Sequence, residues 1–165
     1  MTVNFEKEYD YNFDFDEYKL AKSVIEKAAD IAGCPYETEV NLTLTDEETI
    51  REINNTYRNI DSSTDVLSFP MLEYKEPECF DLDDETGTEN FNPDTGELVL
   101  GDIVLCIPKV ISQAKQFGHS VKREYAFLIA HSMMHLFGHD HMNPQEEEIM
   151  TKRQEEVLGA LNITR

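Results

Sequence analysis

The chain is poor in basic residues. It carries 14 Lys and Arg against 34 Asp and Glu, which gives a formal net charge of −20 at pH 7. Phosphate backbones and anionic membranes repel a protein of this charge, so the composition argues against non-specific binding to either. Any nucleic acid that the protein handles must therefore be bound at a local site.

Cysteines and long apolar runs are also scarce. The three cysteines, Cys34, Cys79 and Cys106, are odd in number and form no CxxC pair, which argues against a disulfide framework. No apolar stretch approaches the ~18 residues of a membrane-spanning helix. The N-terminal segment is acidic where a signal or transit peptide would be basic. We therefore expect a soluble protein of the cytoplasm that does not contact a membrane.

The pattern of apolar residues predicts one domain over residues 1–165, of the α+β class. Helical spacing predicts helices over about 16–32, 45–57, 108–117, 120–137 and 143–161, and strands are predicted over 38–45, 66–69 and 98–107. We expect Thr45 and Glu48 to form a capping box, and Gly101 to mark a bulge or a close backbone approach. The predicted architecture is a small mixed sheet packed with about five helices, with a metal site at the end of a central helix.

Residues 75–97 combine acidic residues with Pro, Gly, Asn and Thr and show no sustained periodicity. This composition predicts an exposed, mobile loop inserted between two strands. An acidic site for a metal or a partner is the alternative interpretation of the same segment.

Three histidines, His131, His135 and His141, have the spacing of a metal site. His131 and His135 are one helical turn apart and share a face, and Gly138 can adopt the left-handed conformation that ends a helix and returns His141 to the same point. Three protein ligands leave a fourth position for water, as in catalytic zinc sites. We expect one Zn²⁺ per chain, although nickel, cobalt and copper also bind imidazole clusters.

The same spacing occurs in the metzincin proteases, whose motif is HExxHxxGxxH. Here the position of the general-base glutamate is Ser132, so a peptidase of that type would lack its base. The alternative for the histidines is a set of satisfied core residues. Between the ligands we expect His139 to be an exposed non-ligand, and Asp140 either to orient a ligand ring or to cap the turn.

Four blocks of the sequence, NNTYRNIDSSTDVLSFP, LGDIVLC, HSMMHLFGHDHM and QEEVL, occur in the order found in one known family. On these blocks the chain resembles the YbeY family, bacterial rRNA maturation factors regarded as single-strand-specific endoribonucleases. The family usually has HGxLHLxGYDH, so Ser132, Met134 and His139 depart from its commonest residues, none of them at a ligand position. The resemblance implies that His131, His135 and His141 are zinc ligands.

The resemblance also implies that Arg58 is the functional arginine of the family. A guanidinium is well shaped to bind phosphate with two parallel hydrogen bonds and to stabilise charge on a phosphoryl oxygen. By its position alone, Arg58 could instead be a solvated residue at a helix end. Asp65 and Asp102 are candidates, like Asp140, to lie behind the metal ligands, with turn capping as their alternative role.

We therefore expect a zinc-dependent, single-strand-specific endoribonuclease that acts in rRNA maturation and ribosome quality control. Its partners would be single-stranded rRNA regions and the ribosome or ribosome-associated proteins. One alternative is a ribosome-assembly factor with a structural zinc and little catalysis, and a metzincin-like metallopeptidase ranks third. Because the chain is acidic, we expect the acidic loop to lie away from the cleft and the few cations beside it, namely Arg58, Lys109, Lys115, Lys122 and Arg123.

Overall fold

The computed structural model describes residues 1–81 and 88–163. The elements, in chain order, are β1 (Thr2–Lys7), α1 (Glu17–Ala32), β2 (Thr38–Thr45), α2 (Glu47–Arg58), β3 (Val66–Pro70), a 3-10 helix (Thr88–Asn90), β4 (Leu98–Cys106), α4 (Ile107–Phe117), α5 (Val121–Leu136) and α6 (Pro144–Ala160). The predicted α+β class is confirmed. None of the described helices is long and apolar enough to cross a membrane.

The sheet has the strand order β1-β2-β4-β3. β1, β2 and β4 run parallel, and β3 pairs antiparallel with β4 at the edge. β1 was not predicted from the sequence. It is an edge strand that buries Val3 alone, and Glu6 and Lys7 at its end obscure the alternation that identifies a strand.

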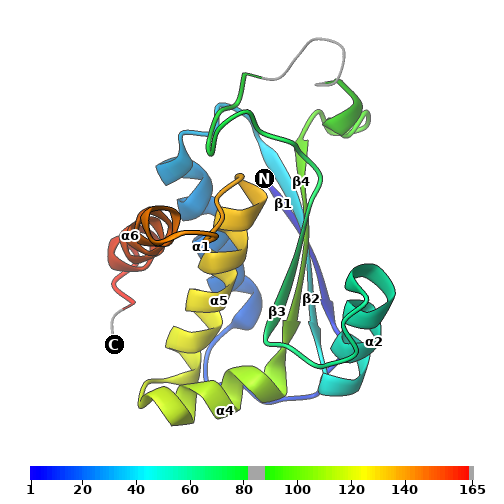
Figure 1. Cartoon of the computed structure of the whole chain (residues 1–165), viewed down its shortest axis with the longest axis vertical. Helices are drawn as coiled ribbons and strands as arrows, with labels where there is room; N and C mark the ends of the chain where they lie inside the picture. The colour runs from blue at the N-terminus through cyan, green and yellow to red at the C-terminus, as the bar shows by residue number, and fades with distance from the viewer. Residues whose placement is uncertain (82–87, 164–165) are drawn as a thin grey trace.

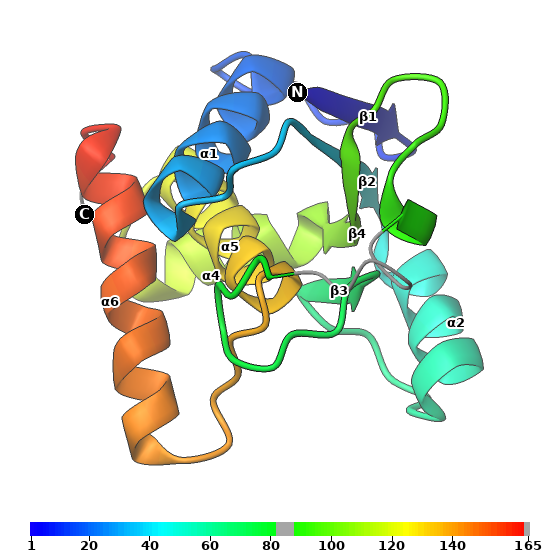
Figure 2. The same ribbon diagram turned by 90° about the horizontal axis from the view of Figure 1, so that it is seen from above.

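The helices form unequal layers on the two faces of the sheet (Figures 1 and 2). α1, α5 and α6 lie on one face, where α5 runs through the middle of the main core and is buried along most of its length. α2 lies on the other face over a small cluster that contains Ile50, Leu67, Val104 and Cys106. β3 therefore lies between α2 and α5. Because β3 is an edge strand, residues at the ends of both helices can reach the same side of the domain beyond it.

The helix ends follow the predicted signals with one exception. Asp16, Ser120 and Asn143 accept hydrogen bonds as N-caps of α1, α5 and α6. The capping box predicted for α2 is wrong, because Asp46 is the N-cap and accepts from the backbone N–H of Thr49 at 2.7 Å. The hydroxyl of Thr45 instead donates to Glu8.

Gly101 lies where the backbone of β3 approaches β4 closely. Its φ is 142°, and a Cβ atom there would lie 2.2 Å from the carbonyl oxygen of Phe69 and 3.1 Å from the side chain of Leu136. The register of β4 against β2 also shifts at this level, between Glu39 and Val40. The predicted bulge with close backbone approach is confirmed, and the missing side chain lets the end of α5 pack against the sheet.

The predicted acidic loop is only partly exposed. Its residues 82–87 lie outside the described part of the chain. Lys75, Glu76 and Pro77 are exposed, but Glu97 is 8% exposed and accepts a hydrogen bond from Thr2. Glu78 is half-buried and turns inward. The described ends of this segment are therefore fixed to the domain.

Candidate metal centre

The structure brings His131, His135 and His141 together at the C-terminal end of α5. The Nε2 atoms of His131 and His135 are 3.2 Å apart. Gly138 has a φ of 93°, so the chain reverses after the helix and places His141 beside the other two rings. One ligand atom from each histidine lies within 4.8 Å of the others, as the sequence spacing predicted.

The protonation of His135 suits a metal ligand. Its Nδ1 lies 3.0 Å from the carbonyl oxygen of His139, which can only accept a hydrogen bond. Nδ1 therefore carries the ring proton, and the lone pair of Nε2 points toward His131 and His141. Three converging imidazoles with an exposed third member make a donor set that suits zinc or a similar transition metal.

Burial keeps the inner histidines neutral. Burial is the largest cause that lowers the pKa of His131 to about 4, with further lowering by His135 and His141 and a small opposing effect of Asp65. Burial also lowers the pKa of His135. Because a metal ion competes with protons for imidazole, neutral rings at pH 7 are ready to bind one.

Residues from other segments hold the turn that carries His141. His139 is 7% exposed, and its Nε2 lies 2.9 Å from Glu78, which also pairs with Arg153 of α6 at 2.7 Å. The prediction of an exposed His139 is therefore wrong. Tyr74 packs on Gly138 so closely that a Cβ atom there would lie 2.9 Å from the ring.

Asp140 caps this turn. Its carboxylate accepts the backbone N–H of His141 at 2.8 Å, and the groups that contact the rings from behind are the carbonyl of His139 and the side chain of Gln154. Of the two roles considered for Asp140, the structure therefore favours turn capping. Gln154 was not predicted as a site residue, because it lies 23 positions from His131 in the sequence.

The side chain of Ser132 is directed at the edge strand β3. It is fully buried, and its hydroxyl forms a hydrogen bond with the hydroxyl of Ser68 in β3. The helical position that carries the base in metzincins thus joins α5 to the edge strand in this protein, and it offers the three histidines no carboxylate base.

Arg58 lies in the same cleft as the three histidines. It is the last residue of α2, and its Nη2 donates to the carbonyl oxygen of Ser68 at 2.9 Å, with the guanidinium 5.6 Å above the ring of Phe69. The cleft has a volume of about 820 Å³ and is lined by Arg58 together with His131, His135 and His141. The end of α2 therefore places this arginine in the same cleft as the candidate metal site.

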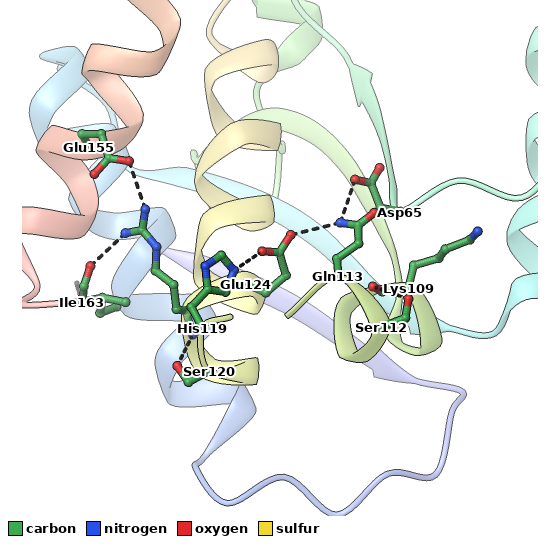
Figure 3. Close-up of polar contacts among 10 residues, drawn as sticks. Asp65, Lys109, Ser112, Gln113, His119, Ser120, Glu124, Glu155 and Ile163 are labelled. Carbon is green, nitrogen blue, oxygen red and sulfur yellow. Dashed lines mark hydrogen bonds and ion pairs between the residues drawn. The ribbon is translucent and has the colours of Figure 1, made fainter. Parts of the chain in front are cut away.

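Asp65 also lines the cleft, and a chain of partly buried polar groups holds it there (Figure 3). One carboxylate oxygen accepts from the backbone N–H of Val66 at 2.7 Å, and the other accepts from Gln113 at 3.3 Å. Gln113 also donates to Glu124 at 3.0 Å, which in turn meets His119 at 2.5 Å. Asp65 thus lies directly before β3, as a turn residue would, and its carboxylate is close enough to His131 to interact with that ring.

Asp102 does not reach the cleft. Its carboxylate accepts a hydrogen bond of 2.7 Å from Asn41, a neighbour across the sheet. Asp102 pairs with Phe69 of β3. The next residue, Ile103, points to the opposite face of the sheet, where it belongs to the main core beneath α5. The proposed place of Asp102 behind the metal ligands is therefore wrong, because side chains alternate along a strand and its carboxylate points to the α2 face.

The predicted group of cations beside the cleft is absent from the described residues. Arg58 is the one Lys or Arg among the residues that line it, and Glu73 and Asp140 are there too. Arg123 is buried and donates to the carbonyl of Ile163 and to Glu155. The acidic segment is not remote either, because Glu78 binds His139 at the rim.

The chain is similar to known proteins along nearly its whole length. The sequence model of the endoribonuclease YbeY family matches residues 3–162. The endoribonuclease YbeY of Lachnoclostridium phytofermentans is 55% identical over 165 residues, and that of Lachnospira eligens is 56% identical over 169, each covering both chains completely. A solution structure of a Thermotoga maritima protein, 26% identical, superimposes with a TM-score of 0.57 over 97% of this chain and 91% of that one. The chain therefore belongs to the endoribonuclease YbeY family.

Proposed function

We propose that this protein is a zinc-dependent, single-strand-specific endoribonuclease that acts in rRNA maturation and ribosome quality control. Its relatives carry the name endoribonuclease, which supports hydrolysis of RNA. The observation that carries the proposal is the presence of Arg58 and three converging histidines in one cleft. The site combines groups for holding a metal ion with a group for holding a phosphate.

His131, His135 and His141 would hold the ion. A zinc ion bound there supplies a Lewis acid that lowers the pKa of bound water toward ~7 and polarises a phosphoryl oxygen. Arg58 binds the phosphodiester, since the donors not used by Ser68 remain for phosphate oxygens, and it stabilises the negative charge that grows on them. The contact with Ser68 fixes the guanidinium before the substrate arrives, which lowers the cost of orienting it.

The charge of the cleft favours a flexible substrate. One arginine faces the RNA beside Asp65 and Asp140, so neutralisation of many phosphates at once does not drive binding. A single strand can bend one phosphodiester toward Arg58, whereas the backbone of a duplex is held in a regular helix. Because the cleft binds the RNA only locally, the substrate that we propose is single-stranded rRNA held on the ribosome or on a ribosome-associated protein.

A ribosome-assembly factor with a structural zinc is the second candidate. Structural zinc sites have four protein ligands, whereas the cluster in the described residues comprises three histidines, of which His141 is exposed. A purely structural zinc site does not need an arginine in the same cleft. Both observations favour catalysis. The free Cys34, Cys79 and Cys106, together with the bacterial relatives, support work in the reducing cytoplasm.

We expect the zinc-loaded protein to cleave an unstructured RNA oligonucleotide at least about tenfold faster than the same strand in a perfect duplex, because only the flexible strand can bring a phosphodiester to Arg58. Cleavage products resolved on a denaturing gel give both rates. A DNA strand of the same sequence tests whether the 2′-OH takes part. Equal rates on single strand and duplex would contradict strand specificity.

We also expect no cleavage of peptide substrates, and no gain of peptidase activity from Ser132→Glu. The new carboxylate would replace a buried hydroxyl bonded to Ser68, so it would face the sheet rather than the metal cluster. Release of fluorescence from a quenched peptide library measures this. Strong zinc-dependent proteolysis by the purified native protein would overturn the assignment to RNA.

Binding to free RNA is expected to be weak and to depend only slightly on salt. Each phosphate contact with a single strand contributes about −0.7 to the slope of log K against log salt concentration. Because one cation of the described residues lines the cleft, we expect a slope corresponding to about one or two contacts. Fluorescence anisotropy across a salt series measures it. A slope of about −4, equivalent to about six contacts, would require a basic groove and contradict the account.

A further inference from the structure

Gln154 is a buried polar residue of α6 whose side chain meets a candidate metal ligand. It is 3% exposed, and its amide nitrogen lies 2.5 Å from Nδ1 of His131. Both residues border a hollow between α5 and α6 that Phe127 and Met150 also line. A buried amide loses its hydrogen bonds to water, and the contact with the imidazole replaces one of them.

The direction of that hydrogen bond decides whether His131 can bind a metal. A neutral imidazole has one N–H and one lone pair, so binding through Nε2 requires the proton on Nδ1. Nε2 is the atom that faces the shared site, since it lies 3.2 Å from Nε2 of His135. His135 has its proton fixed on Nδ1 by the main-chain carbonyl of His139. In the corresponding place His131 has the side-chain amide of Gln154.

An amide can meet the ring in two ways. If its nitrogen donates to Nδ1, the ring proton must sit on Nε2, where it blocks the lone pair. A half-turn of the amide exchanges nitrogen for oxygen without changing the shape of the side chain, and the oxygen can then accept a proton from Nδ1. Both orientations fit the same space. The first leaves His131 unable to bind a metal ion through Nε2, and the second leaves it able to do so.

We propose that Gln154 is a positioning residue whose Oε1 accepts the Nδ1–H of His131 and thereby selects the ring form that binds zinc. This inference rests on the proposed function to the extent that His131 is a zinc ligand. Gln154 then holds His131 as the His139 carbonyl holds His135. The neighbouring Arg153 pairs with Glu78, the partner of His139, so α6 supports the metal centre at two adjacent residues.

Zinc affinity, measured by competition with a chelator at fixed pH, tests the inference. Gln154→Leu keeps the approximate volume and removes the acceptor, so we expect about 10- to 100-fold weaker zinc binding, the usual effect of losing such a partner. Gln154→Glu offers only acceptors, so its affinity should equal or exceed that of the native protein. Gln145→Leu, on an exposed position of the same helix, is the control and should bind as the native protein does.

Nitrogen-15 NMR of the metal-free protein reads the ring form directly. We expect the proton of His131 on Nδ1 in the native protein and a shift toward Nε2 in Gln154→Leu. This measurement uses neither RNA nor zinc, so its failure is distinct from failure of the nuclease assignment. A proton on Nε2 in the native protein, or native zinc affinity in Gln154→Leu, would overturn the proposal.

Thermal unfolding of the metal-free variants separates positioning from packing. If Gln154→Leu does not fold, the native spectrum and Gln154→Glu decide. A proton on Nδ1 with undiminished zinc affinity of the Glu variant supports the proposal. A more than tenfold weaker affinity of that variant contradicts it, because a residue that acts only as an acceptor should be replaceable by a carboxylate.

Discussion

Replacing His135 with alanine is expected to remove bound zinc and to lower the rate of RNA cleavage by more than about a hundredfold. Loss of a residue that only hydrogen-bonds to a metal ligand already costs up to about a hundredfold, so loss of a ligand itself should cost more. The reason is geometric. The three rings form a compact triangle, with centroid separations of 4.8 Å between His131 and His135, 5.3 Å between His135 and His141, and 5.7 Å between His131 and His141. Without His135 two imidazoles remain, too few for a stable zinc site of this kind.

Metal content by elemental analysis and initial cleavage rates measure the two effects together. Met142→Ala is the matched control, because Met142 follows His141 in the same turn and is 80% exposed. The control should keep zinc and activity. Retention of one zinc per chain by His135→Ala would show that the metal is held elsewhere, and native activity without zinc would exclude a catalytic metal at this cluster.

Arg58→Ala is expected to keep its zinc and its fold but to cleave RNA about a hundredfold more slowly or worse, the scale of losing one donor to a developing oxyanion. Arg58 contacts the carbonyl of Ser68 and the ring of Phe69 without an ion pair to a described acidic side chain. Its positive charge is therefore available for a phosphate. Arg58→Lys keeps the charge but loses the planar fork, so an intermediate rate is expected.

Arg51 provides a control on the same helix. It lies two turns before Arg58, is largely exposed and pairs with Asp61 at 2.8 Å. Arg51→Ala removes the same kind of side chain from α2 outside the cleft, so activity should change little, since exposed ion pairs contribute only about 0–1 kcal/mol to stability. Equal rates for Arg58→Ala and the native protein would exclude the catalytic role of Arg58.

The proximity of the three histidines was predictable because its information is local. His131 and His135 share a face of one helix, and Gly138 supplies the backbone conformation that returns His141, all within eleven consecutive residues. The helices and the close approach at Gly101 were predictable for the same reason. Each depends on capping residues, apolar periodicity or a glycine that can be read from a short segment.

The supports of the cluster were not predictable in this way. His139 is polar and follows a glycine, which indicates exposure, yet Glu78 meets it across 61 positions in the sequence. Gln154 lies within an acidic helix and reaches His131 only because α6 packs on α5. Asp102 was misplaced because the face to which a strand residue points depends on register, which the bulge at Gly101 alters. Such contacts follow from tertiary packing rather than from local sequence.

The predicted distribution of cations was also wrong, and the observed distribution changes how RNA binding is explained. A chain with a net charge of −20 was expected to concentrate its cations around the substrate. Instead Arg123 stabilises the contact between α5 and α6, and Arg153 holds the turn of the metal centre. With Arg58 as the one cation that lines the cleft in the described chain, recognition of RNA depends on what presents the strand to the enzyme.

The most direct test of the account is the rate of single-stranded RNA cleavage as a function of zinc bound per chain. Metal-free protein is loaded in steps, and the bound zinc and the initial rate are measured on the same samples. We predict negligible cleavage without metal and a linear rise that stops at one zinc per chain, because three histidines form one site. A rate that is already maximal in the metal-free protein, or that does not change with bound zinc, would contradict the account.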